Sequence, residues 1–311
     1  MAVIDGLPEI KVSVRLNGSN DDCVEYDDPD PPQTTASRGT ATHSISKIIE
    51  SQDDANFSVH YELKDARRWI QGNRGLVVKV YIDGSIVKSS VIQKKTLRNG
   101  VGRYVVEGMM TESERPGKAF LKPFRFAAIK QVEESDVRIT EDLKVVKHLG
   151  NIEIIVYRAK IRGRGNWKPL AAILKTELAE KAMKGKNLSH GTSLSEGREI
   201  RKPRSVTYKY PDGEVRLARF VFRYKSKAAL QIEGTIPRDP SPEPSPEPQT
   251  QNVADLPEAE ILRLAQERLD QLADVKREGA SSVKREADDE INLDRRKVYK
   301  TDADGTIDLT E

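Results

Sequence analysis

Residues 76–92 read LVVKVYIDGSIVKSSVI, and this stretch has two apolar runs on either side of an Asp-Gly pair. Asp83 and Gly84 are the residue types that adopt the positive φ angles of a two-residue primed turn. The runs 76–82 and 85–92 are rich in β-branched residues, which favour strands. The stretch therefore predicts an antiparallel hairpin.

The same two-residue periodicity recurs along the chain before residue 239. Apolar and polar side chains alternate in residues 10–16 and 57–63, a pattern typical of strands that bury one face. Further strands are expected at 103–110, 124–129, 152–161, 206–210 and 215–224. Pro211-Asp212-Gly213 predicts that the last two form a second hairpin.

Helices are expected to be few. Pro169 is suited to a first helical turn, Gly185 to a helix end, and an apolar face lies between them, made of Leu170, Ile173, Leu174 and Leu178. Residues 226–232 predict a second, short helix. We therefore expect a mainly β fold, an antiparallel β-sandwich or barrel-like domain with one or two peripheral helices.

The composition changes near residue 239. Residues 1–238 carry 42 basic and 30 acidic side chains, whereas residues 239–311 carry 10 and 19. Two tandem Ser-Pro-Glu-Pro peptides at 241–248 exclude a helix or a central strand there. We therefore divide the 311-residue chain into a β-rich domain (1–238) and a linker (239–254), which a tail follows.

The tail begins with a predicted amphipathic helix at 255–273. Asp255, Pro257 and Glu258 form a helix start, and the apolar residues Ile261, Leu262, Ala265, Leu269 and Leu272 share one face. We expect this face to dock onto the domain or, alternatively, to dimerise. Residues 274–311 are charged and nearly free of aromatic residues, so they predict a disordered regulatory tail.

The sequence excludes several classes of protein. Cys23 is the only cysteine and cannot form an internal disulfide, the N-terminus lacks the layout of a signal peptide, and no long apolar run could cross a membrane. The four histidines at 43, 60, 148 and 190 lack metal-ligand spacing. We expect a non-enzymatic protein without catalytic residues, metal or cofactor.

Two weaker motifs in the sequence resemble functional sites. The segment 191–195 begins like a nucleophile elbow around Ser193 but has Ser195 where the motif requires glycine. Asp27, Asp28 and Asp30 are typical ligands of a hard cation, but without a later bidentate Glu they predict a solvated acidic turn.

Basic side chains predict candidate nucleic-acid contacts in the β-rich domain. One basic stretch contains Arg158, Lys160, Arg162, Arg164 and Lys168, with Trp167 available to stack on a base. A second contains Arg198, Arg201, Lys202, Arg204 and Lys209, and clusters of this kind also act in nuclear import. The alternative is that residues 158, 160 and 162 are the solvent-facing side of a strand.

A peptide repeated in the tail resembles acceptor sites for the small ubiquitin-like modifier SUMO. The sequence Val-Lys-Arg-Glu occurs at 275–278 and again at 283–286, so Lys276 and Lys284 are the predicted acceptors. An extended segment lets the conjugating enzyme hold the aliphatic residue and Glu while the lysine reaches the thioester. The alternative is the duplication of a charged, solvating peptide.

The last six residues, 306–311, resemble a SUMO-interaction motif. Ile307 and Leu309 would enter the groove of SUMO as an added strand, and Asp308 and Thr310 would face outward. Thr306 departs from the motif, which often has an aliphatic residue there. The alternative is a frayed terminus.

The order of elements resembles a fungal family of uncharacterised proteins over roughly residues 7–240. The residues that carry the resemblance are Tyr26-Asp27-Asp28-Pro29, the stretch 78–84, the stretch 188–194, Phe220-Val221-Phe222-Arg223-Tyr224, and Ile236-Pro237-Arg238 before a Ser-Pro linker. The resemblance implies a domain of unknown function and no catalytic motif.

These patterns together predict a nuclear, non-enzymatic interaction protein. Its domain has an unknown ligand, and its partners are SUMO and the SUMO-conjugating enzyme, with no membrane. The alternative is a nucleic-acid-binding module that uses the basic β-rich domain.

Overall fold

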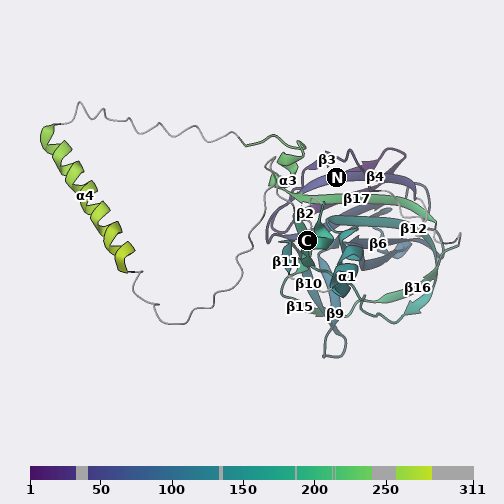
Figure 1. Cartoon of the computed structure of the whole chain (residues 1–311). Helices are drawn as coiled ribbons and strands as arrows, with labels where there is room; N and C mark the ends of the chain where they lie inside the picture. Colours follow the sequence, from purple (N-terminus) through teal and green to yellow (C-terminus); the bar gives the residue numbers. More distant parts are fainter. Residues whose placement is uncertain are drawn as a thin grey trace, which may run out of the picture. The chain divides into compact units, whose positions relative to one another are not determined.

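The structure, a computed structural model, describes residues 1–32, 41–132, 136–185, 188–211, 213, 215–239 and 257–281. It divides into two units, Met1–Asp239 and Pro240–Glu311. The first unit is mainly β and contains two large sheets, shown in Figure 1.

The first sheet has eight strands and curls like half of a barrel. Its central order is β1-β2-β5-β10-β14, with β8 beside β5, and β9 and β15 beside β10. The strands are β1 (Ala2–Ile4), β2 (Leu7–Leu16), β5 (Asn56–Lys64), β8 (Val101–Val106), β9 (Gly108–Glu112), β10 (Lys118–Ala128), β14 (His190–Leu194) and β15 (Arg198–Arg201).

The second sheet has seven strands in the order β3-β4-β17-β12-β6-β7, with β16 also beside β12. They are β3 (Glu25–Asp27), β4 (Ala41–Ser51), β6 (Arg74–Ile82), β7 (Ser85–Ile92), β12 (Asn151–Gly165), β16 (Ser205–Lys209) and β17 (Arg216–Ser226). Figure 1 shows β4, β17 and β12 side by side. β4 and β17 are parallel, so the sandwich is not purely antiparallel.

One core lies between the two sheets. The first sheet contributes the alternating residues of β2 and β5, and the second contributes alternating residues of β6, β12 and β17. Aromatic rings connect the sheets, because Phe57 stacks on Phe126 at 4.1 Å and Phe126 contacts Tyr224 of β17 at 5.0 Å. The predicted mainly β sandwich is therefore confirmed.

The hairpin at 76–92 is also confirmed. Asp83 and Gly84 have φ angles of 49° and 79°, both in the left-handed region. A Cβ on Gly84 would lie 2.7 Å from the Cβ of His148, so packing as well as backbone conformation requires glycine there. β6 and β7 pair from Leu76 opposite Ile92 to Ile82 opposite Ser85.

The turn also places the Asp83 carboxylate in the protein interior. It accepts hydrogen bonds from the backbone nitrogens of Gly150 and Thr192, each at 2.9 Å, and from the hydroxyl of Tyr224 at 2.7 Å. Burial raises the pKa of Asp83 to about 6, although these donors oppose the shift. Asp83 thus joins the hairpin turn to β14 of the other sheet and to the start of β12.

The predicted hairpin around residues 211–213 is wrong. β16 and β17 do not pair with each other. β17 pairs with residues 151–157 of β12, and β16 pairs with residues 160–165 of the same strand. Because β12 is 15 residues long, it accommodates both strands end to end, an arrangement that a local turn signal does not encode.

The predicted helix at 169–185 is also wrong. Most of this segment is irregular, followed by β13 (Glu177–Ala179), which pairs in parallel with β11 (Lys130–Val132), and the short helix α2 (Glu180–Met183). Leu174 packs against the main core, whereas Leu178 belongs to a separate cluster. An extended chain reaches both clusters, which a single helical face would not.

Two other helices belong to the first unit. The predicted short helix is confirmed as α3 (Lys227–Ile232), in which the side chain of Ser226 caps the backbone nitrogen of Ala229. The sequence does not predict α1 (Asp136–Val146). Its β-branched Ile139, Thr140 and Val145 lower helix propensity.

The described part of the second unit is the helix α4 (Glu258–Ser281). It begins after Pro257, as the sequence predicts, but continues eight residues past the expected end at 273. The prediction ended with the apolar stripe, whereas the charged residues that follow are themselves good helix formers. Among the described helices, none is long and apolar enough to span a bilayer.

We predict that Asp83→Asn destabilises the domain by about 1–3 kcal/mol, because an amide NH₂ then faces a backbone N–H donor inside the core. The pKa of Asp83 is raised in the folded state, so its contribution to stability is complete below pH 4 and is lost as the pH rises to about 6. The variant has no carboxyl group at position 83, so its free energy of unfolding does not fall in this way. The difference in free energy of unfolding between the wild-type protein and the variant should therefore narrow between pH 4 and pH 7.

Urea unfolding at pH 4 and at pH 7 measures this difference, with the exposed Asp21→Asn as the control. A gap that stays constant or widens contradicts the assignment.

Candidate nucleic-acid interface

In the second half of β12, buried and exposed side chains alternate along the strand. Tyr157 and Ala159 are buried on one face, where they pack with Tyr208 and Tyr210. Arg158 and Lys160 alternate with them and are exposed. The first two predicted contact residues therefore lie on the same solvent-facing side of one strand.

Neighbouring strands bring further cations to the same place. Lys160 lies directly opposite Arg74 of β6 on one edge and opposite Lys209 of β16 on the other. Adjacent strands are about 5 Å apart. We call Arg74, Arg158, Lys160 and Lys209 the basic ledge.

Within the described structure, no acidic side chain neutralises the charges of the basic ledge. All four side chains are exposed, and none forms an ion pair or side-chain hydrogen bond with a described residue. Like charges directly opposite each other in a sheet are destabilising. The fold therefore carries an electrostatic cost at this site that an anionic ligand would offset.

A bulge divides the predicted basic stretch. The register of β12 and β16 shifts between Ile161 and Gly163, so that Arg164 lies opposite Val206. Arg164 is consequently on the same face as Tyr208, away from the basic ledge, and Arg162 is in the bulge itself. The structure brings together only part of the set that the sequence suggests.

Trp167 connects the two predicted basic stretches. The ammonium group of Lys202 lies 5.3 Å from its ring centroid, which is within the range of a cation–π contact. Lys168, Arg201 and Arg204 are exposed, and Arg198 forms an ion pair with Glu107 at 2.8 Å.

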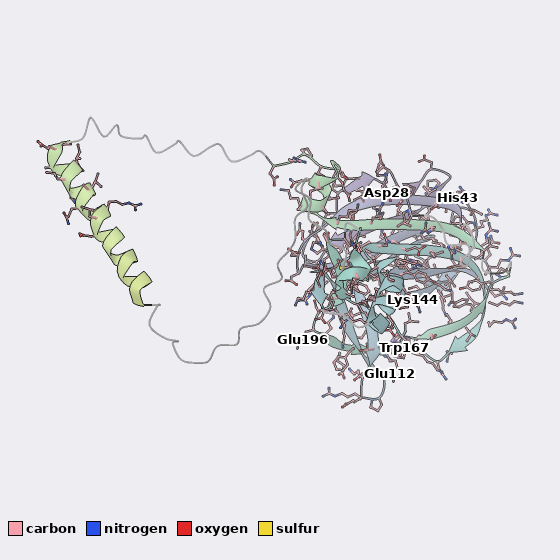
Figure 2. All side chains as sticks on the ribbon, viewed as in Figure 1. Asp28, His43, Glu112, Lys144, Trp167 and Glu196 are labelled. Carbon is pink, nitrogen blue, oxygen red and sulfur yellow. The ribbon has the colours of Figure 1, made fainter. Side chains whose placement is uncertain are left out.

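A pocket of about 280 Å³ opens beside the basic ledge, at the end of the second sheet where β4 and β17 begin. Arg158 belongs to both. The other lining residues are Thr42, His43, Arg67, Trp69, Gly213, Val215 and Leu217. Figure 2 labels His43 and Trp167 well apart on the domain, and Trp167 is not among the residues that line this pocket.

Trp69 is a candidate binding residue that the sequence analysis missed. The signal was present, because Arg67 and Arg68 directly precede the tryptophan. The Arg67 guanidinium lies 5.8 Å from the ring centroid of Trp69. Arg67 is held by Glu9 and by the carbonyl of Gly6, each at 2.8 Å, and its hydrogen bond lowers the pKa of Glu9.

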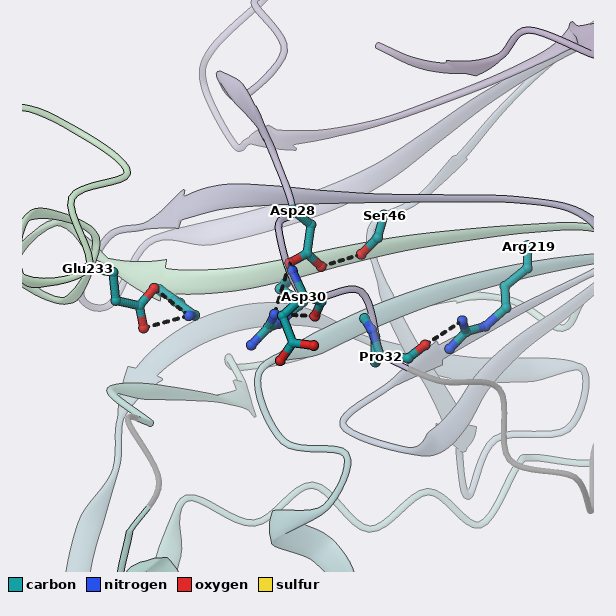
Figure 3. Close-up of polar contacts among 8 residues, drawn as sticks. Asp28, Asp30, Pro32, Ser46, Arg219 and Glu233 are labelled. Carbon is teal, nitrogen blue, oxygen red and sulfur yellow. Dashed lines mark hydrogen bonds and ion pairs between the residues drawn. The ribbon is translucent and has the colours of Figure 1, made fainter.

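The acidic loop after β3 has a structural role. Figure 3 shows the hydrogen bond that Ser46 donates to the carboxylate of Asp28. The same carboxylate also accepts a hydrogen bond from Nη1 of Arg223. Its side chain is 0% exposed, and the ion pair with Arg223 is 2.9 Å long. The predicted solvated turn is therefore wrong for Asp28, since arginine supplies the positive charge there. Arg219 holds the loop further along by donating to the carbonyl of Pro32 at 3.0 Å.

Comparison with known protein families identifies the domain. A family model described as a domain of unknown function, DUF7918, matches residues 9–239. The chain belongs to this family. No curated protein and no solved structure matches the chain. The DUF7918 match ends where the first compact unit ends, so the family corresponds to the two-sheet unit.

One cluster in the DUF7918 domain resembles the side chains of a hydrolase. His190 contacts Ser51 at 3.1 Å through Nδ1 and the carboxylate of Asp53 through Nε2. However, Ser51 is only 3% exposed, so substrate has no access to its hydroxyl. The cluster ties β14 to the turn after β4. Ser193 instead contacts Arg125 at 3.2 Å, and the described residues include no cluster of metal ligands.

The candidate SUMO residues lie beyond the DUF7918 domain. Lys276 is on helix α4, whereas the sequence predicts a disordered tail from residue 274. The helix continues through Lys276 because the charged residues there are good helix formers. Lys284, Ile307, Asp308, Leu309 and Thr310 are outside the described residues.

We predict that Lys160→Thr stabilises the DUF7918 domain by roughly 0.2–1 kcal/mol, because it removes repulsion from two cations and introduces a good strand former. Lys11→Thr is the matched control, since Lys11 is an exposed strand lysine opposite an acid, Glu62. The control should be neutral or destabilising. Urea unfolding at low ionic strength measures both, and a stability loss in Lys160→Thr equal to the control's would contradict repulsion at the ledge.

Proposed function

We propose that the DUF7918 domain of this protein is a non-enzymatic nucleic-acid-binding module and that the basic ledge is its contact surface. The observation that carries the proposal is the row Arg74, Lys160 and Lys209 on three adjacent strands, without an acidic partner among the described residues. A phosphate backbone would neutralise this row and release its own counterions.

The arrangement favours a ligand with repeated negative charge. Arg158 extends the row along β12, so the cations spread in two directions across the sheet surface. Contacts between basic side chains and phosphates position the backbone of the nucleic acid and do not read its base sequence. With the basic segment at 198–204, this supports a nuclear location, in the fungal setting that the sequence resemblance implies.

Charge reversal tests the proposal. The double variant Lys160→Glu, Lys209→Glu in the full chain should weaken binding to an oligonucleotide at least about tenfold at 50 mM salt, and it should reduce the salt slope by roughly 2, one for each lost phosphate contact. The matched control is Lys11→Glu, Lys64→Glu, which changes two exposed strand lysines on the other sheet.

Fluorescence anisotropy over a salt series measures both slopes. Equal losses in the two double variants would indicate a general effect of net charge and would remove the ledge as the contact surface.

A second proposal concerns the tail, which we infer is modified by SUMO and binds SUMO. The duplicated Val-Lys-Arg-Glu peptide supports it, with the acidic residues 288–290 after the second copy. Lys276 lies on α4, and a conjugating enzyme needs an extended segment, so local unwinding precedes modification there. Ile307 and Leu309 serve as the reader, a strand added to the sheet edge of SUMO.

In reconstituted conjugation, Lys284→Arg should remove most of the product, Lys276→Arg less, and the double variant nearly all of it. The physical reason is the cost of unwinding the helix around Lys276. Lys297→Arg with Lys300→Arg is the control, because these tail lysines lie outside the motif. Unchanged products in the Lys276, Lys284 double variant would refute the acceptor assignment.

A further inference from the structure

We infer that the pocket beside the basic ledge accepts one unpaired nucleotide, which makes the domain selective for single-stranded nucleic acid. This inference rests on the proposed nucleic-acid function. It adds a specific pocket and a specific ligand form, which the ledge alone does not define.

The chemistry of the pocket suits a nucleotide. Trp69 provides an aromatic ring, and Val215 and Leu217 provide apolar walls. Arg67 and Arg158 also line this space. An aromatic ring beside arginines is the combination that binds a base by stacking and its phosphate by charge.

The neighbouring hydrogen bonds keep this arrangement in place. Glu9 and the Gly6 carbonyl hold Nε and Nη2 of Arg67. The remaining nitrogen, Nη1, has no partner among the described residues. No nitrogen of Arg158 has a partner in the part of the chain that the structure describes. Both arginines therefore have donors available for a phosphate.

Arg158 connects the pocket to the ledge. It lies two residues before Lys160 on the same face of β12, and two residues of a strand span about 7 Å. A backbone bound along Arg74, Lys160 and Lys209 would thus pass the mouth of the pocket. One nucleotide could then turn inward without the strand leaving the ledge.

The size of the pocket discriminates against a duplex. Its volume of about 280 Å³ is close to the lower limit of ordinary ligand pockets, roughly 300 Å³. A paired base reaches Trp69 only by leaving its stack, which costs a few kcal/mol, whereas an unpaired base avoids most of this cost.

Intrinsic fluorescence provides a direct probe of the pocket. The chain has two tryptophans, so Trp167→Phe in the full chain leaves Trp69 as the only one. A single-stranded 12-mer of mixed sequence should quench Trp69 on binding, and the corresponding 12-base-pair duplex should not. Quenching by neither, although both bind, overturns the inference.

Two valines with similar exposure allow a matched test of the apolar wall of the pocket. Val215 in the pocket is 53% exposed and Val105 on β8 is 50% exposed, so glutamate at either position should be compatible with folding. Val215→Glu should weaken binding of the single strand roughly fivefold to a hundredfold, the range expected for loss of one stacked base. Val105→Glu should weaken both forms little and equally.

The ratio of single-strand to duplex affinity decides the outcome. A ratio that falls in Val215→Glu and not in Val105→Glu supports the inference. An unchanged ratio overturns the pocket and leaves the ledge as a contact for either form. Absence of binding to both forms at 50 mM salt overturns the pocket and the proposed nucleic-acid function together.

Trp69→Phe and Trp69→Leu separate stacking from packing. Trp69 also packs against the core, so both variants should lose some stability in urea unfolding. Only the leucine variant should lose selectivity for the single strand, because phenylalanine retains a ring for stacking. Equal selectivity in the two variants also overturns the inference.

Discussion

The buried carboxylate of Asp83 holds the two sheets in their relative position. Its donors come from the end of β17, from β14 in the opposite sheet and from the residue before β12. A buried carboxylate without donors would be costly, so its network requires all three segments to be in place. The Asp-Gly turn thus has two roles, one in the local hairpin and one in the assembly of the sandwich.

Strand β12 begins directly after Gly150 and contributes both to the hydrophobic core and to the candidate interface. Its first half is buried between β6 and β17 and supplies Ile152, Ile154 and Val156 to the core. Its second half extends past β17, pairs with β16 and presents cations to solvent. The buried half anchors a rigid strand, and rigid strands hold charged side chains at fixed spacing better than loops do.

Other arginines of the domain, unlike those of the basic ledge, form ion pairs with acidic side chains. Arg223 pairs with Asp28, and Arg219 donates to the carbonyl of Pro32, so both arginines secure the loop after β3 to the sheet. Arg219 also pairs with Glu153 of β12. The arginines of the ledge lack such partners among the described residues. The contrast explains why net charge alone is a poor guide to function, since paired arginines stabilise the fold and unpaired ones are available to a ligand.

Sequence patterns alone determined the hairpin at 76–92, the alternation in β2 and β5, the mainly β class and the start of α4, because turn chemistry and periodicity are local properties. Only the tertiary structure decided that Lys160 lies between Arg74 and Lys209 and that Trp69 lines a pocket with Arg158. It also decided that residues 170–176 are not helical. These features depend on pairing between segments distant in the chain. That pairing is set by how both faces of a sheet pack, which no short stretch of sequence encodes.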